Sequence, residues 1–224
     1  MKFEILYPQA YPMAKFTLAN REVIHAESSS LVALAGEIHV DTHFRGSQIR
    51  PHVHGAPGAE TVFIHTFRAL EEGAEILLAS RIPGELTLET IPPAPAALVI
   101  SPQAFLAATE KILIDNIIRG SGAYSARQGL HLLHCTGEGK VLLAVSGALH
   151  RVTLTGEPPL FLRASHLAGF TEGVRFRFRQ VGGIRTTQIL GELLDLQGAG
   201  TVLVQSRAWR PAGPAPGEPR EGHA

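Results

Sequence analysis

The sequence contains very little cysteine, with Cys135 as the single example among 224 residues. One thiol excludes a disulfide-stabilised scaffold and any zinc or iron–sulfur site that needs several cysteines. Because Cys135 lies in an apolar run, we expect it in the core and not as a nucleophile. No serine lies in a Gly-x-Ser-x-Gly elbow, and the stretch 120–123 lacks the lysine of a phosphate-binding loop. We therefore predict no enzymatic activity, no catalytic residue and no cofactor.

Neither sign of charge is in excess, because 20 Lys and Arg residues balance 20 Asp and Glu residues. This balance argues against a basic nucleic-acid-binding protein and against an acidic disordered chain. Long hydrophobic runs are also missing: no stretch approaches the roughly 20 apolar residues of a membrane span, and the first residues do not form a signal peptide. We expect a cytoplasmic protein without a membrane span.

Short apolar or alternating runs, separated by Gly, Pro and acidic turns, fill most of the sequence. Examples are 14–18, 22–25, 31–34, 37–44, 61–67, 75–80, 86–90, 97–100, 111–118, 129–135, 140–146, 174–181 and 201–207. Runs of this length with frequent turn signals predict an all-β sandwich or barrel. The Pro- and Gly-rich tail 211–224 has no residue that could anchor it in a core, so we expect disorder there.

One hairpin pattern occurs three times along the chain. Each copy has a strand, a turn of small residues and an apolar strand that ends at Ser, and the copies span 61–80, 129–146 and 192–206. The turn glycines Gly73, Gly139 and Gly200 are 66 and 61 residues apart. Such a period indicates a repeat architecture, in which no unit buries its apolar face alone.

A second pair of matching segments supports the same register. Residues 106–112 align with residues 168–174, which lie 62 positions later, and residues 32–38 form a looser first copy. We therefore predict one domain over 1–210, built from three repeated units. The units span roughly 13–84, 85–149 and 150–209.

Several phrases in the chain are shared with a known family. They are Ala-Glu-Ser at 26–28, Leu-Val-Ala-Leu at 31–34, Pro-Gly-Glu-Leu at 83–86, Gln-Ala-Phe-Leu-Ala at 103–107, Ser-Gly-Ala-Leu-His at 146–150 and Arg-Gln-Val-Gly-Gly-Ile at 179–184. On these phrases the chain resembles the altered-inheritance-of-mitochondria protein 24 family from about residue 1 to 209. The resemblance implies a fold similar to the tryptophan RNA-binding attenuation protein, of the double-stranded β-helix type, with three intertwined β-sandwich units in one chain. It also implies a homo-oligomer shaped as a ring or disc. None of the phrases is a catalytic signature.

The segment 44–59 departs from the family pattern and contains His52 and His54, with Glu60 close behind. Two histidines at positions i and i+2 of a strand point the same way, and a carboxylate could complete a metal site. The spacing is longer than in the first cupin motif, and the second cupin motif is missing. We favour an exposed polar loop and keep a metal-binding protein or metal-dependent enzyme as the alternative.

Three arginines, Arg175, Arg177 and Arg179, alternate with Val174, Phe176 and Phe178. On a strand this pattern predicts one basic and one apolar face. The basic face could bind RNA or another anion. The zero net charge, and the lack of aromatic residues between the arginines on that face, favour a solvated face or pairing with acidic residues across the sheet.

The remaining histidines include two pairs, His39 with His43 and His131 with His134. We expect rim or half-buried positions for them. If they gather at a subunit interface, protonation near pH 6 would loosen the oligomer. The function that this sequence favours is a non-enzymatic oligomeric β-scaffold or binding protein, with the ligand and the number of subunits left open.

Overall fold

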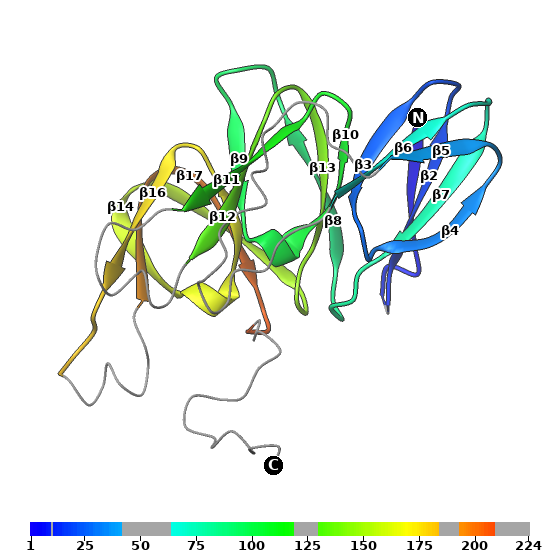
Figure 1. Cartoon of the computed structure of the whole chain (residues 1–224). Helices are drawn as coiled ribbons and strands as arrows, with labels where there is room; N and C mark the ends of the chain where they lie inside the picture. The colour runs from blue at the N-terminus through cyan, green and yellow to red at the C-terminus, as the bar shows by residue number, and fades with distance from the viewer. Residues whose placement is uncertain (10, 42–63, 119–129, 184–192, 209–224) are drawn as a thin grey trace, which may run out of the picture.

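The structure is a computed structural model, and it describes residues 1–9, 11–41, 64–118, 130–183 and 193–208 (Figure 1). The N-terminal strands are β1 (Lys2–Leu6), β2 (Met13–Leu18), β3 (Val23–Glu27), β4 (Leu31–Ala35), β5 (Ile38–Asp41), β6 (Ile64–Ala69) and β7 (Ala74–Ala79). The middle strands are β8 (Leu86–Ile91), β9 (Ala97–Ile100), β10 (Phe105–Thr109), β11 (Leu113–Ile118), β12 (His131–Thr136) and β13 (Gly139–Ala144). The C-terminal strands are β14 (Leu149–Arg163), β15 (Leu167–Thr171), β16 (Val174–Arg179) and β17 (Leu193–Gln205).

Two single 3-10 turns, η1 (Pro102–Ala104) and η2 (Ala164–His166), are the helical elements within the described ranges. The all-β prediction is therefore confirmed. Across the same residues there is no helix with the length and apolar character needed to cross a membrane.

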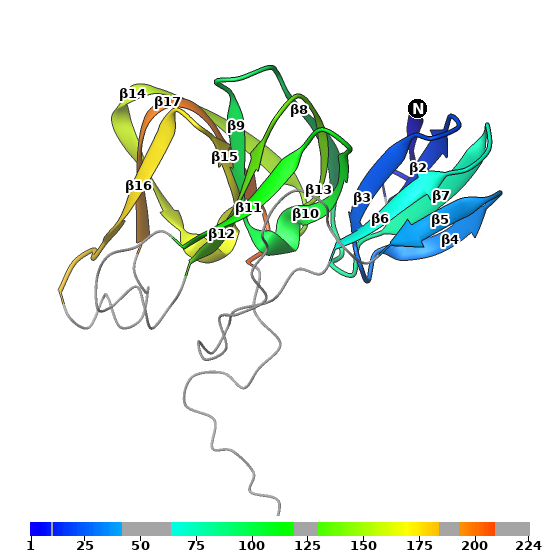
Figure 2. The ribbon, with the colours of Figure 1, turned by 45° about the horizontal axis from the view of Figure 1, so that its top comes forward.

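The strands form three antiparallel sheets. The first has the order β1-β2-β7-β4, the second β5-β6-β3-β10-β13-β8, and the third β11-β12-β9-β15-β17-β14, with β16 also paired to β17. The molecule is elongated, with β4 and its neighbours at one end and β14 and β16 at the other (Figures 1 and 2). The second and third sheets each combine strands from two distant parts of the sequence.

Alternation of apolar and polar residues explains the strands locally. In β2 and β7 every second side chain is buried, as expected for strands with one face on a core. The turn from β12 of the third sheet to β13 of the second sheet needs a glycine at Gly137, where φ is +99° and a Cβ would collide with the carbonyl oxygen of Lys111. Gly198 plays the same part within β17, since its φ is +104° and a Cβ would collide with the carbonyl oxygen of Gly173.

Three apolar clusters lie along the molecule. The first contains Phe16, Phe67 and Leu78, the second Phe105, Ile114 and Cys135, and the third Phe170, Leu194 and Val202. Cys135 is completely buried, as expected, and burial raises the pKa of its thiol to about 12. The thiol therefore stays protonated at neutral pH and is not a nucleophile.

Two joins connect strands of distant parts of the chain. Strand β3 pairs with β10, where His25 lies opposite Ala108, and strand β9 pairs with β15, where Val99 lies opposite Phe170. Each join extends one sheet from one core to the next. The apolar clusters are consequently connected by shared sheets.

A register irregularity occurs at one equivalent place in three strands. It lies between Leu31 and Ala33 of β4, between Phe105 and Ala107 of β10, and between Leu167 and Gly169 of β15. In each case the irregular strand pairs with the strand that follows the predicted turn: β7, β13 or the second half of β17. The hairpins predicted there are wrong, because β6 and β7, like β12 and β13, lie in different sheets and do not pair, and the third copy is one continuous strand. The predicted boundaries of the three units remain a prediction, and this recurrence is the structural pattern that agrees with them.

The long strands differ from the sequence expectation. The runs around 192–196 and 201–206 belong to one continuous strand, β17, and β14 extends over 15 residues. Strand β14 passes through Gly156 and two prolines, where its register against β17 shifts. An edge strand tolerates proline because its missing N–H does not interrupt a ladder on the open side.

Candidate functional site

The predicted metal residues His52, His54 and Glu60 lie outside the described residues, as does His43. Within the described ranges, no three His, Cys, Asp or Glu residues are grouped so that they could hold a metal ion. The metal alternative therefore stays a prediction about the segment 42–63.

The arginines of β16 face outward, and two of them meet an acidic partner. Arg177 Nε donates a hydrogen bond of 2.9 Å to Asp195 Oδ2, and Arg179 Nη1 lies 3.7 Å from the same oxygen. Gln197 Nε2 donates to Asp195 Oδ1 at 2.9 Å. Arg175 is exposed on the same strand. Strand β16 therefore combines a cross-strand ion pair with an outward basic row.

Asp195 is the buried acidic group of this arrangement, since its side chain is inaccessible to solvent. Burial alone would raise the pKa of its carboxyl group. The hydrogen bonds from Arg177 and Gln197 and the charges of Arg177 and Arg179 outweigh that effect and hold the pKa below its usual range. Asp195 is thus ionised at neutral pH and ties β16 to β17.

His25 is a buried polar residue at the join between β3 and β10. Its Nδ1 lies 3.0 Å from Thr66 Oγ1. Burial lowers the pKa of the His25 imidazole, and Glu110 opposes this shift only in part. His25 is therefore neutral at pH 7. Of the predicted histidine pairs, His39 lies exposed on β5 and His134 half-buried on β12, so their link to assembly remains a prediction.

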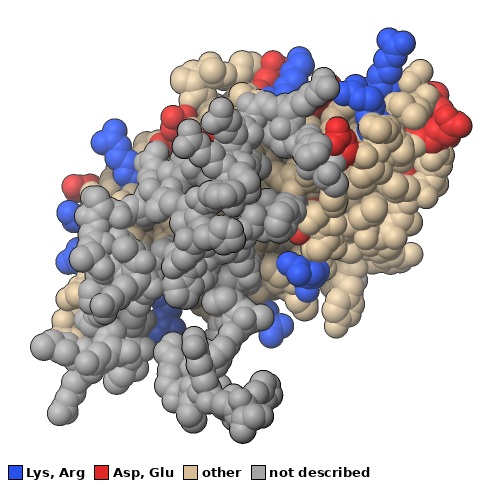
Figure 3. All heavy atoms as spheres, viewed as in Figure 1, with Lys and Arg blue, Asp and Glu red and all other residues tan. Residues whose placement is uncertain are grey.

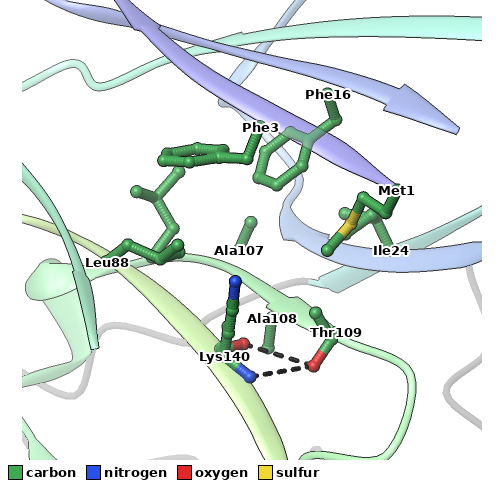
Figure 4. Close-up of a pocket in the computed structure, with 10 residues that line it drawn as sticks. Met1, Phe3, Phe16, Ile24, Leu88, Ala107, Ala108, Thr109 and Lys140 are labelled. Carbon is green, nitrogen blue, oxygen red and sulfur yellow. Dashed lines mark hydrogen bonds between the residues drawn. The ribbon is translucent and has the colours of Figure 1, made fainter. Parts of the chain in front are cut away.

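Two small cavities lie among the described residues. One lies between β1, β2 and β10 and is lined by apolar residues such as Phe3, Phe16 and Leu88, with the Thr109 hydroxyl bonded to Lys140 at its rim (Figure 4). Its volume is about 10 Å³, which is room for about one water molecule. A shallower one of about 160 Å³ lies beside Tyr11 and Arg81, well below the size of a typical ligand site.

Strand β4 is the most unusual surface of the molecule. It is the last strand of its sheet, and all five of its residues are exposed although all are apolar. Leu31 is 39%, Val32 52% and Leu34 37% exposed. The area around β4 and β7 is also largely free of Lys, Arg, Asp and Glu on the face shown in Figure 3. An uncovered apolar edge of this kind marks an interaction site or an aggregation hazard.

A second uncovered edge belongs to β14 at the opposite end of the molecule. Leu160, Phe161 and Leu162 pair with β17 on one side, and within the described ranges no strand pairs with their other side. The Phe161 side chain is 43% exposed, and the guanidinium of Arg179 lies 4.8 Å from the centre of its ring. The molecule therefore has one apolar strand edge at each end.

Sequence reasoning did not identify Phe161 or the strand that carries it. The prolines at 158 and 159 interrupt the apolar pattern there. The signal that could have found it is the Leu-Phe-Leu triplet at 160–162 directly after them, because proline is acceptable on an edge strand.

Together, these features define an all-β protein of several antiparallel sheets, with uncovered apolar strand edges at β4 and β14 among the described residues. The family model described as "Mitochondrial biogenesis AIM24" matches residues 3–207. The chain belongs to this family, as its sequence phrases predicted.

A solved structure has the same fold. The X-ray crystal structure of a Streptococcus pyogenes protein superimposes with a TM-score of 0.74 at 18% sequence identity, covering 92% of this chain and 94% of that chain. A comparison with curated proteins gave no match. The similarity therefore establishes the architecture, and the chemistry has to be argued from this chain.

Proposed function

We propose that this chain is a non-enzymatic subunit of a homo-oligomeric β-scaffold, assembled in the cytoplasm as a ring or disc. The observation that carries the proposal is the exposed apolar strand β4. A monomer would leave its leucines and valine in water next to unpaired backbone groups, which is the template that edge strands offer to another chain.

Hydrophobic burial would favour this assembly. Covering an apolar side chain completely contributes about 1.5–3 kcal/mol. Leu31, Val32 and Leu34 are roughly half exposed, so each would supply about 1 kcal/mol. Added backbone hydrogen bonds along the strand would fix the direction and register of the contact.

The recurring bulge supports a triplicated fold similar to that of the tryptophan RNA-binding attenuation protein. Strands β4, β10 and β15 have the same irregularity against the same kind of partner. A repeat whose terminal member is uncovered, as β4 is in the first unit, is completed either by a capping element or by another chain. This is the reason for proposing a closed oligomer.

The deciding experiment is sedimentation velocity combined with native mass spectrometry on the untagged full chain. We expect one discrete species larger than a single chain, which persists when the salt concentration rises, because apolar contacts are not screened. A chain that stays monomeric at micromolar concentration would overturn the proposal.

Metal analysis of the same preparation tests the non-enzymatic part. We expect no stoichiometric metal. Zinc, iron, manganese or nickel bound at one ion per chain, and lost on substitution of His52 and His54 by alanine, would favour the metal site instead.

A further inference from the structure

The two joins inside the chain show how one part of this fold adds to the next. In the first, Ile24, His25 and Ala26 of β3 lie opposite Thr109, Ala108 and Ala107 of β10. In the second, Leu98, Val99 and Ile100 of β9 lie opposite Thr171, Phe170 and Gly169 of β15. Both joins bury the residues of the bulged strand, whose patterns are BBBBi for β10 and β15 alike.

Strand β4 corresponds to β10 and β15, but it has no neighbour in the place that β3 takes beside β10 and β9 takes beside β15. After the irregularity, Ala33 lies opposite Leu77, as Ala107 lies opposite Leu142 and Gly169 opposite Leu203. Leu34 thus corresponds to Ala108 and Phe170. Those two residues are 2% and 1% exposed, whereas Leu34 is 37% exposed.

The end of β14 occupies the position of β3 and β9 in the same scheme. Ile100 lies opposite Leu133, four residues before Gly137, and Leu162 lies opposite Leu194, four residues before Gly198. Both glycines have positive φ. Leu160, Phe161 and Leu162 therefore correspond to Leu98, Val99 and Ile100, which are the residues that contact β15.

The two unfilled positions are complementary and lie at opposite ends of the molecule (Figures 1 and 2). One end has the bulged strand β4 without a neighbour like β3 or β9. The other end has such a neighbour, the 160–163 part of β14, without a bulged strand beside it. Within the described ranges neither edge has another strand partner. A single chain cannot bring them together, whereas two copies can.

We infer that β4 of one copy pairs in antiparallel fashion with the 160–163 part of β14 of a second copy. The pairing places Leu34 opposite Phe161, Ala33 opposite Leu162 and Ala35 opposite Leu160. This inference rests on the proposed oligomer and specifies its interface.

The pairing reproduces the strand order that the chain already uses. Joining the two edges gives the strand order β16-β17-β14-β4-β7-β2 across two copies. The second sheet, β5-β6-β3-β10-β13-β8, and the third, β11-β12-β9-β15-β17-β14, have the equivalent strand at each place in the order. The contact is heterologous, since two different surfaces meet. Repetition therefore closes into a ring or extends as a filament.

Mixing two variants tests the interface, because a heterologous contact can be blocked from either side. We expect Leu34→Lys and Phe161→Lys each to be monomeric alone. An equimolar mixture should form dimers and nothing larger, because the intact β14 of the first variant meets the intact β4 of the second. Leu113→Lys, at a 46% exposed leucine on the edge strand β11, is the matched control and should assemble like the wild type.

The possible results separate the two proposals. A monomeric wild-type chain overturns the oligomeric scaffold and this interface together. An oligomer that both lysine variants leave unchanged overturns only the interface. Loss of assembly in Leu34→Lys alone, with Phe161→Lys unaffected, would indicate a symmetric contact between two β4 strands and would also overturn it. A cooperative thermal unfolding transition in each monomeric variant, at a similar temperature in both, shows that the variants are folded and that only assembly is lost.

Disulfide trapping tests the register. Inside the chain, the Ser101 amide donates to the Ala168 carbonyl at 2.9 Å, next to the pair of Ile100 with Gly169. The equivalent intermolecular pair, Ala33 with Leu162, is consequently a non-hydrogen-bonded pair, whose Cα atoms lie about 4.5 Å apart. That distance suits a disulfide.

We therefore expect Ala33→Cys mixed with Leu162→Cys to give a cross-linked dimer under mild oxidation. Ala35→Cys mixed with Leu162→Cys is the off-register control and should cross-link poorly. Cys135 does not compete, because it is completely buried. Preferential cross-linking of the control mixture would overturn the register.

Discussion

Strands β4 and β10 have the same bulge and a similar apolar composition, and each pairs with a strand that follows a predicted turn, yet one is exposed and the other buried. The difference in exposure comes from the edge of each strand that faces away from β7 or β13. Strand β3 covers β10, whereas no strand of the described chain covers β4. The comparison shows that burial at these positions is decided by the neighbouring strand and not by the local sequence.

Truncating the equivalent residues of the buried and exposed strands should give the largest contrast. We expect Phe170→Ala to lower the free energy of unfolding by about 3–5 kcal/mol, because it opens a cavity in a closed core. Leu34→Ala should lower it by less than about 1 kcal/mol. Urea denaturation in a Phe161→Lys background measures both effects without a contribution from assembly. Equal losses would mean that β4 is covered within its own chain.

Two glycines with positive φ, Gly198 within β17 and Gly73 between β6 and β7, offer a second contrast. Gly198→Ala should cost about 2–3 kcal/mol, because positive φ combines with a collision against the carbonyl oxygen of Gly173. Gly73→Ala should cost about 1 kcal/mol, since its φ is +83° but no atom lies within 4 Å of the added Cβ. Thermal unfolding of the two variants compares them. A similar loss of stability in both variants would show that the positive φ, and not the collision at Gly198, sets the free-energy cost.

Removing the charge of Asp195 should cause a smaller loss of stability than Gly198→Ala, at the end of the molecule where β14 lies. We expect Asp195→Asn to lower stability at pH 7 by about 1–2 kcal/mol, because it weakens buried hydrogen bonds from Arg177 and Gln197. The pKa of this carboxyl group is lowered in the folded state, so its stabilising contribution is present above its unfolded pKa, near 4, and is lost as the pH falls through the folded value. The difference between variant and wild type should therefore shrink below about pH 4.

The half-exposed pair of Lys15 with Glu75 is the matched control, with Lys15 Nζ 2.7 Å from Glu75 Oε1. Glu75→Gln should change stability by no more than about 1 kcal/mol, since solvent screens the pair. A loss with Glu75→Gln as large as with Asp195→Asn would contradict the role given to burial at Asp195.

Much of the fold was accessible from the sequence. Alternation in runs such as 14–18 and 75–80 predicted strands where β2 and β7 lie, because the period of two is a local property. The long strand β14 was missed, because Gly156 and two prolines suggested a break. Its position at a sheet edge removes the penalty that proline carries inside a sheet.

The candidate site was predicted less well. The residues named for metal binding lie outside the described chain, and the arginine row was expected either to bind an anion or to pair across the sheet. Asp195 is the partner of Arg177 and Arg179, but it lies on a different strand, some 16 to 18 residues later. Nothing in the spacing of the arginines points to it, because antiparallel register is set by the intervening turn.

By itself the sequence determined the all-β class, the buried cysteine and the family, since each depends on local periodicity, composition or shared phrases. The tertiary structure alone decided which apolar strands are covered. Residues 31–35 and 105–109 are both apolar runs that predict strands. Whether burial stabilises each strand depends on a neighbouring strand from a distant part of the sequence. For β10 that strand is β3 of the same chain. For β4 the equivalent strand, the 160–163 part of β14, is at the far end of the molecule, so in the proposed interface it comes from a second copy.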